Sequence, residues 1–201
     1  MTHRYPRMIG LAALALLGAC DQASDPASAR SDEPPLAGAS IGGPYRLVNQ
    51  DGKTVGRDDF AGKYRVVYFG YTYCPDICPV DMGNLGKAMR DLDRSDPALA
   101  RQVVPVFISV DPARDTPPVL KQYVSAFYPR MVGLTGTDEQ IAKVADEFAV
   151  YYKRVGDNDE NYLVNHSGQA YLMGPSGEPI ALVPVDESPE AVEKVLKRWV
   201  T

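Results

Sequence analysis

A hydrophobic run that leads into two cysteines constrains the fold of this chain more than any other stretch. Residues 66–71 are rich in valine and aromatic residues, which is typical of a buried strand. Cys74 and Cys78 follow, each with a proline after it, and helical periodicity starts at about Pro79. The unpaired N–H groups and positive dipole end of a helix N-terminus favour thiolate over thiol. The stretch therefore predicts a reactive thiol pair between a strand and a helix.

The spacing of Cys74 and Cys78 favours a metal site over a permanent disulfide. Residues four apart on one helix face have Cβ atoms about 5–6 Å apart. A disulfide requires about 3.5–4.5 Å between Cβ atoms, so oxidation of this pair would demand local unwinding. A soft metal ion with sulfur bonds of about 2.3 Å bridges the wider pair without that distortion. We expect a metal-holding pair that can also undergo redox chemistry.

The N-terminal residues have the pattern of an exported protein. Arg4 and Arg7 precede an apolar run over residues 8–19, which is too short to span a bilayer but matches a signal peptide. Leu17-Gly18-Ala19-Cys20 resembles a bacterial lipobox, although an ordinary cleavage site with a chance cysteine is the alternative. We predict a signal peptide over residues 1–19, then lipidated Cys20 with a disordered tether over residues 20–40, rich in Ala, Ser, Asp and Pro. The protein would then be lipid-anchored to a bacterial cell membrane and face the periplasm.

The amino-acid composition limits the classes of molecule that this protein is expected to bind. A net charge of −5 without a lysine- or arginine-rich run argues against nucleic acid. Three cysteines are too few for a disulfide framework. Because exported dithiols tend to oxidise, the Cys74/Cys78 pair would need a thiol reductant or would alternate between two states.

Strands and helices alternate over residues 41–201, which predicts one α/β domain. A cysteine pair between the first core strand and its helix is typical of a thioredoxin-like fold. We expect that fold with an extra N-terminal β-hairpin and a C-terminal β-hairpin plus helix. The expected hairpins cover 45–55 and 169–185, the core strands 66–71, 103–110 and 131–134, and the helices 80–92, 117–127, 141–150 and 189–198.

His166 is the candidate third ligand. It follows residues 156–161, a polar stretch that we expect to be a mobile loop, and a lone loop histidine is usually solvated or hydrogen-bonded. Here it begins the C-terminal hairpin, which faces the cysteine site in thioredoxin-like folds. Two thiolates and an imidazole suit copper, because soft thiolates hold Cu(I) and a nitrogen donor accommodates Cu(II). A structural zinc site would need a fourth ligand, and Met82 is assigned to the helix core instead.

Polar residues follow the strand over 103–110, where α/β folds place their sites. Asp111, Arg114 and Asp115 either dock a partner and shape the site, or end the strand and cap the next helix, and the structural interpretation is favoured. Tyr71 and Tyr73 beside the cysteines would shield a metal, receive a partner or merely pack.

These motifs resemble the Sco/SenC family of copper-binding, thioredoxin-like proteins. The matching stretches are GYTYCPDICP at 70–79, ISVDPARDTP at 108–117, GLTG at 133–136 and VNHS at 164–167. The resemblance implies that Cys74, Cys78 and His166 bind copper and that the cysteines cycle between dithiol and disulfide. It also implies a role in assembling the dinuclear copper centre of cytochrome c oxidase. The chain has Asn165 and Gly174 where the family usually has aspartate, so the surroundings of His166 and its support for Cu(II) are expected to differ.

The leading hypothesis is a copper chaperone rather than an enzyme, carrying Cu(I) or Cu(II) from a periplasmic copper donor to an oxidase subunit. Asp111, Tyr73 and Asn165 are candidates to support the ligands or dock a partner. The alternative is an exported thiol–disulfide oxidoreductase that acts on the cysteines of the oxidase subunit or another protein and does not need His166. A peroxidase, and a copper sensor or store, remain as further alternatives.

Overall fold

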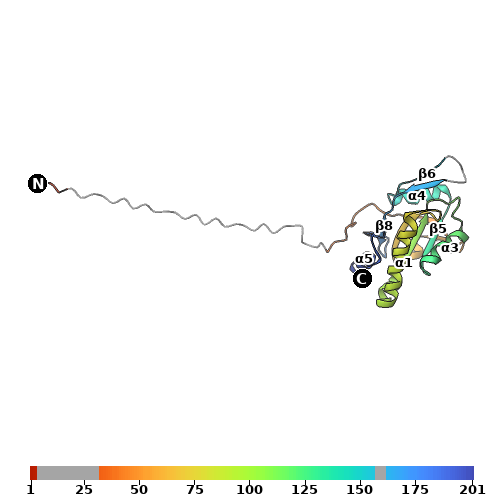
Figure 1. The fold of residues 1–201 in the computed structure, drawn as a ribbon, viewed down its shortest axis with the longest axis horizontal. Coiled ribbons are helices and arrows are strands. Elements are labelled where there is room, and N and C mark those ends of the chain that lie inside the picture. The colour runs from red at the N-terminus through yellow and green to blue at the C-terminus, as the bar shows by residue number, and fades with distance from the viewer. Residues whose placement is uncertain (4–31, 157–161) are drawn as a thin grey trace. The chain divides into compact units, whose positions relative to one another are not determined.

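The structure is a computed structural model that describes residues 1–3, 32–156 and 162–201 (Figure 1). Residues 4–19 of the predicted signal peptide, the lipidation of Cys20, the first part of the tether and most of the expected loop at 156–161 lie outside these residues. Within the described ranges, no helix has the length and apolar character needed to cross a membrane.

A seven-stranded mixed sheet forms the centre of the domain, in the order β2-β1-β5-β4-β3-β8-β9. Strands β3, β4 and β5 are parallel to one another, whereas both outer pairs, β1/β2 and β8/β9, are antiparallel hairpins. This topology confirms the predicted α/β fold with an N-terminal hairpin and a C-terminal hairpin plus helix. The strands are β1 (Arg46–Asn49), β2 (Thr54–Gly56), β3 (Tyr64–Gly70), β4 (Val103–Ser109), β5 (Val132–Thr135), β6 (Tyr152–Val155), β7 (Leu163–His166), β8 (Ala170–Met173) and β9 (Pro179–Val183).

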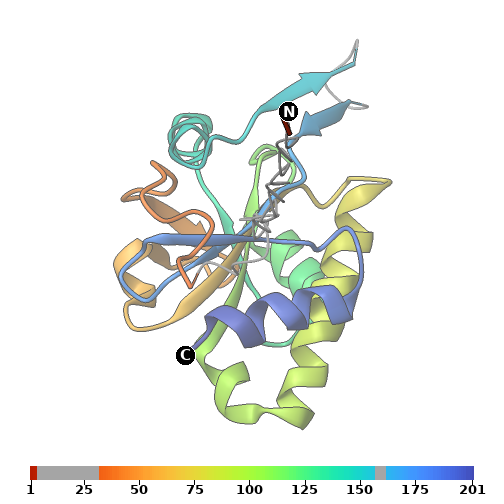
Figure 2. The ribbon, with the colours of Figure 1, turned by 90° about the vertical axis from the view of Figure 1, so that its left-hand side faces the viewer.

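Helices cover both faces of the sheet, so the central strand β3 is buried along its whole length. Side chains alternate across a strand, which sends Tyr68 toward Asp81 of α1 and Phe69 toward Phe148 at the end of α4. Helix α1 packs against α3 and α5 on one face, and α4 lies on the other (Figure 2). The helices are the 3₁₀ helix η2 (Arg57–Phe60) and α1 (Ile77–Ser95), α2 (Pro97–Gln102), α3 (Pro117–Phe127), α4 (Asp138–Glu147) and α5 (Pro189–Trp199).

Several expected boundaries differ from the structure by a few residues, and two of the differences change an interpretation. The segment predicted to be a disordered tether to residue 40 already contacts the domain at Leu36, whose N–H donates to the carbonyl of Ile180 in β9 at 3.0 Å. Helix α1 begins at Ile77 rather than at about Pro79. The shift at α1 matters for the site because it places Cys78 in the first turn of the helix, while Cys74 stays outside it.

A second, two-stranded sheet of β6 and β7 was not expected from the sequence. Its strands pair in antiparallel register from Tyr152 opposite His166 to Val155 opposite Leu163. His166 is therefore the last residue of a strand and not a loop residue. The β6–β7 hairpin is hydrogen-bonded as a separate sheet, so other contacts must hold it against the domain.

Candidate metal centre

The cysteines lie at the carboxyl end of β3. Cys74 is in the turn before α1, where its N–H donates to the carbonyl of Tyr71 at 3.2 Å, and Cys78 is in the first turn of α1. The expectation that both share one helix face is therefore wrong, because the helix begins three residues after Cys74. Both thiols are free in the structure, with Cys78 fully buried and Cys74 partly exposed.

His166 is oriented by its neighbour Ser167. Its Nδ1 lies 3.0 Å from the carbonyl oxygen of Ser167, and because a carbonyl only accepts hydrogen bonds, Nδ1 carries the proton. The lone pair is then on Nε2, which lies 3.2 Å from the Sγ of Cys78. This arrangement, with one ring nitrogen held by a carbonyl and the lone pair of the other directed at the Cys78 thiol, is typical of a histidine prepared to bind a metal.

The three donor atoms converge. The Sγ atoms of Cys74 and Cys78 and a ring nitrogen of His166 all lie within 4.8 Å of one another. The rings of Tyr68 and Tyr71 meet the imidazole edge-on, at centroid distances of 6.2 and 5.9 Å, and restrict its rotation. Two soft sulfur donors with one imidazole fit copper, and no described aspartate, glutamate, cysteine or histidine joins the group as a fourth donor for zinc.

Burial controls the ionisation of these groups. Desolvation raises the pKa of Cys78, and the nearby Cys74 thiolate would raise it further, although a hydrogen bond from the Tyr71 backbone opposes both effects. At Cys78, desolvation therefore outweighs the preference for thiolate that a helix start provides. Burial also lowers the pKa of His166, which keeps the imidazole neutral near pH 7 and available as a ligand.

The loop between β4 and α3 supports the cysteine turn through Asp115. This carboxylate is fully buried and accepts hydrogen bonds from the Thr72 N–H at 3.0 Å and the Thr72 hydroxyl at 2.6 Å. It also accepts one from Ser109 at the end of β4. Asp115 therefore fixes the turn that leads to Cys74, and the N-cap position of α3 belongs to Thr116, the other residue that the structural interpretation allowed.

The other candidate residues contact none of the three donor atoms. Asp111 is 1% exposed and pairs with Arg114 and the Tyr162 hydroxyl, while Tyr73 is exposed beneath the Arg114 guanidinium. Asn165 is exposed, and because side chains alternate along β7 it points to the opposite face from His166. The departure from the family at Asn165 therefore lies on the outer face of the hairpin.

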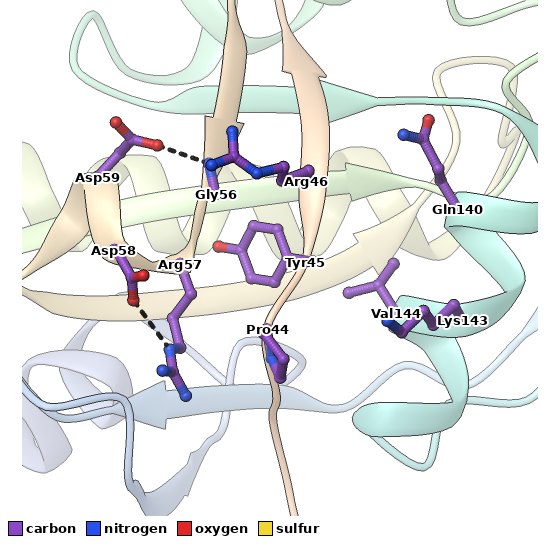
Figure 3. Close-up of a pocket in the computed structure, with 10 residues that line it drawn as sticks. All are labelled: Pro44, Tyr45, Arg46, Gly56, Arg57, Asp58, Asp59, Gln140, Lys143 and Val144. Carbon is purple, nitrogen blue, oxygen red and sulfur yellow. Dashed lines mark hydrogen bonds and ion pairs between the residues drawn. The ribbon is translucent and has the colours of Figure 1, made fainter.

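Two cavities differ in their distance from the metal centre: one is beside it, and the other is next to α4. An open cavity of about 730 Å³ is bordered by Ile77 and Asp81 of α1, by Ser167 and by Leu182 of β9. Figure 3 shows a different cavity of about 440 Å³ between the β1–β2–η2 region and α4. Its lining has arginine, lysine and aspartate side chains but no thiol or imidazole, so it is not suited to a soft metal.

Comparison with known proteins decides the family. The sequence profile of SCO1/SenC matches residues 33–201. The chain belongs to the SCO1/SenC family. The matched residues include Cys74, Cys78 and His166, so the metal centre lies within the SCO1/SenC domain, as the motif resemblance implied.

Solved SCO1/SenC structures share the fold. Arabidopsis thaliana ScoI, solved with copper bound, is 40% identical, with a TM-score of 0.72 over 79% of this chain and 97% of that one. A family lipoprotein from Bacillus anthracis is 27% identical, with a TM-score of 0.67 over 80% and 95% of the two chains. BsSco, described with a disulfide switch and as a member of a family of cytochrome c oxidase assembly proteins, is 25% identical, with a TM-score of 0.62 over 80% and 94%. These matches confirm the predicted thioredoxin-like Sco fold.

Sequence reasoning did not find two supporting residues of the centre. Tyr162 joins Asp111 and Arg114 from the start of β7, and Thr72 meets Asp115 from the cysteine turn. The apolar residues 162–164 are too short a run to signal the role of Tyr162. The pairing of Thr72 with Asp115, 43 residues away, had no signal in a single sequence.

Proposed function

We propose that this protein is a copper chaperone that binds Cu(I) or Cu(II) through Cys74, Cys78 and His166. The observation that carries the proposal is the convergence of two thiols and an oriented imidazole nitrogen within 4.8 Å. The two thiolates suffice to hold Cu(I), and the imidazole adds the donor that Cu(II) prefers. A SCO1/SenC relative with copper bound supports the same metal here.

The proposed acceptor is the copper-binding subunit of cytochrome c oxidase. This role is supported by the description of BsSco as a member of a family of oxidase assembly proteins. The open cavity beside the centre gives an approach on the His166 side, and Ile77 and Leu182 at its border are 40% and 50% exposed. Ligands on a docked acceptor would replace those of the chaperone one at a time. A periplasmic copper donor and a thiol reductant complete the proposed cycle.

The proposed location is the periplasmic face of a bacterial cell membrane, with the chain anchored through lipidated Cys20. The lipobox-like residues 17–20 and the apolar run before them support this location. A SCO1/SenC lipoprotein from Bacillus anthracis supports it as well. Since a single lipid chain gives only marginal membrane binding, lasting attachment would require more than one.

Substitution of His166 tests the proposed site. In His166→Ala, Cu(II) affinity should fall about a hundredfold or more, while Cu(I) affinity falls less than about tenfold, because Cu(I) retains both thiolates. Competition titrations of the reduced protein with Cu(I) and Cu(II) chelators measure both. Asn165→Ala is the matched control, since Asn165 is on the same strand but faces away, and it should bind both ions as the wild type does. Equal losses of Cu(I) and Cu(II) in His166→Ala would contradict this role of the imidazole.

A second function, thiol–disulfide exchange, is favoured by the two free thiols and by the disulfide switch described for BsSco. In that reaction Cys74 and Cys78 would form a disulfide while a partner disulfide gains two electrons and two protons. One experiment separates the functions. Copper-loaded protein is mixed with the reduced copper domain of the oxidase subunit, and metal-free reduced protein is mixed with the oxidised domain. Copper transfer in the first mixture supports the chaperone. Reduction of the domain's disulfide in the second mixture, without copper transfer in the first, supports the reductase.

The raised pKa of Cys78 makes copper binding dependent on pH. Near pH 7 the Cys78 thiol keeps its proton, and Cu(I) must displace it to bind the thiolate. The apparent Cu(I) affinity should therefore rise with pH from 6 to 8 by at least about tenfold per pH unit, because the Cys78 proton is displaced on binding. Chelator competition across this range measures the slope, and His166→Ala should retain it. A flat profile would show that Cys78 is already ionised in the metal-free protein.

A further inference from the structure

The guanidinium of Arg114 lies between the two segments that carry the proposed copper ligands. Its Cζ atom is 4.8 Å from the ring centroid of Tyr73, in the turn that carries Cys74. The same atom is 3.7 Å from the ring centroid of Tyr162, which immediately precedes the strand that ends at His166. Arg114 thus stacks on both segments at distances at which a guanidinium is attracted by aromatic faces.

Hydrogen bonds add direction to this stacking. Arg114 Nη1 donates to the backbone carbonyl of Tyr162 at 3.1 Å, and its Nε donates to the carboxylate of Asp111. The other carboxylate oxygen of Asp111 accepts from the Tyr162 hydroxyl at 2.6 Å. Asp111 and Tyr162 are 1% and 3% exposed, and hydrogen bonds to charged groups are strong where water is excluded. We call Arg114, Asp111, Tyr162 and Tyr73 the Arg114 bridge.

The β6–β7 hairpin depends on such contacts because it is a sheet of its own. Besides the Arg114 bridge, the Tyr71 hydroxyl is hydrogen-bonded to the Val164 backbone, and Arg154 of β6 stacks on the outer side of Tyr162 at 4.0 Å. Contacts at Tyr162 and Val164, four and two residues before the histidine, therefore help to set the distance between His166 and the thiols.

We infer that Arg114 is a positioning residue of the copper site, which fixes the separation between the cysteine turn and His166 without touching the metal. The inference rests on the proposed function. Since Cu(II) relies on the imidazole more than Cu(I) does, loosening the bridge should weaken Cu(II) selectively. Loss of a residue that orients a metal ligand typically costs about 10–100-fold in metal affinity.

The decisive variant is Arg114→Met, which keeps a long side chain but removes the charge and all its hydrogen bonds. We expect about 10–100-fold weaker Cu(II) binding, an altered Cu(II) electron paramagnetic resonance spectrum, and Cu(I) affinity within about tenfold of the wild type. In the metal-free protein, amide hydrogen exchange at Val164–His166 should accelerate. Tyr162→Phe keeps the stacked ring and removes only the bond to Asp111, so a smaller change in the same direction is expected, and this variant decides the outcome if Arg114→Met does not fold.

Arg130→Met is the matched control. Arg130 stacks on the Tyr128 ring at 5.1 Å, pairs with Asp93 and donates to the Ala100 carbonyl at 3.1 Å, and it contacts neither segment of the metal centre. It should lower thermal stability but leave the Cu(II) spectrum and the exchange of β7 unchanged.

Three outcomes would count against the proposals. If Arg114→Met kept the wild-type Cu(II) affinity and the wild-type hydrogen exchange of β7, the inference would be overturned. Equal losses of affinity for Cu(I) and Cu(II) would also overturn it, because a merely structural role of Arg114 would produce equal losses. Absence of copper binding by the wild type would overturn the proposed function instead.

Discussion

Replacement of either Cys74 or Cys78 by alanine should remove high-affinity Cu(I) binding. Each variant leaves one thiolate and His166, so the ion loses one of its two soft donors. Four-donor structural metal sites gain on the order of 10–16 kcal/mol, which corresponds to a loss of roughly a hundredfold to a thousandfold for each missing donor. Competition with a Cu(I) chelator under reducing conditions measures the loss.

The two cysteine variants differ in what they do to the fold. Cys78 is fully buried, so Cys78→Ala also removes packing and should lower stability, whereas Cys74 is partly exposed and Cys74→Ala should cost little. Met82→Leu is the control for a sulfur donor in the same helix, since Met82 is 1% exposed and belongs to the core. It should bind Cu(I) as the wild type does. Retention of tight binding by either cysteine variant would contradict the proposed ligand set.

Replacement of Gly70 by alanine should damage both the fold and the metal centre. Gly70 ends β3, and a Cβ atom there would lie 2.8 Å from the Cys78 Sγ, 2.9 Å from the Tyr68 ring and 3.0 Å from the Phe107 ring. Both rings and the Cys78 side chain are fully buried, so relief of these contacts must displace the thiol, a ring or the backbone of β3. We expect a loss of about 1–3 kcal/mol in unfolding free energy and at least about tenfold in Cu(I) affinity.

Gly83→Ala is the matched control for Gly70→Ala. Gly83 is inside α1, and a Cβ atom there meets nothing within 4 Å. Alanine should stabilise the helix by about 1 kcal/mol and leave copper binding unchanged. For both variants, denaturant unfolding gives the free energy of unfolding, and chelator competition gives the Cu(I) affinity. Gly70→Ala with wild-type stability and affinity would show that the Cys78 thiol has space that the structure does not reveal.

The fold was largely predictable because its main elements carry their own local signals. The helix over 117–127 was predicted with both ends correct, since a threonine and two prolines mark its start. Thr137 and Gln140 form the expected capping box, although α4 ends three residues before the predicted residue 150. The β6–β7 hairpin escaped prediction because its strands have four residues each and β6 is mostly exposed, so neither shows a marked hydrophobic pattern.

The donors of the candidate site could be named from the sequence, but their arrangement could not. The strand-to-helix position of the cysteines and the isolation of His166 were visible in the residue order. The pKa of Cys78 depends on how many atoms cover the thiol, which only the packed structure reveals. The roles of Asp115 and Asp111 depend on Thr72 and Tyr162, whose proximity is a property of the tertiary fold.

The position of the β6–β7 hairpin outside the main sheet divides the centre into two parts with different constraints. The cysteines are continuous with the hydrophobic core, so changes around them are limited by the packing of β3 and α1. The histidine is on an accessory unit whose outer face, with Lys153 and Asn165, packs against nothing in the core. Exchange of residues 152–166 for another sequence that keeps Tyr152, Tyr162, Val164 and His166 would therefore retune the preference between the two copper oxidation states in a domain that folds as before.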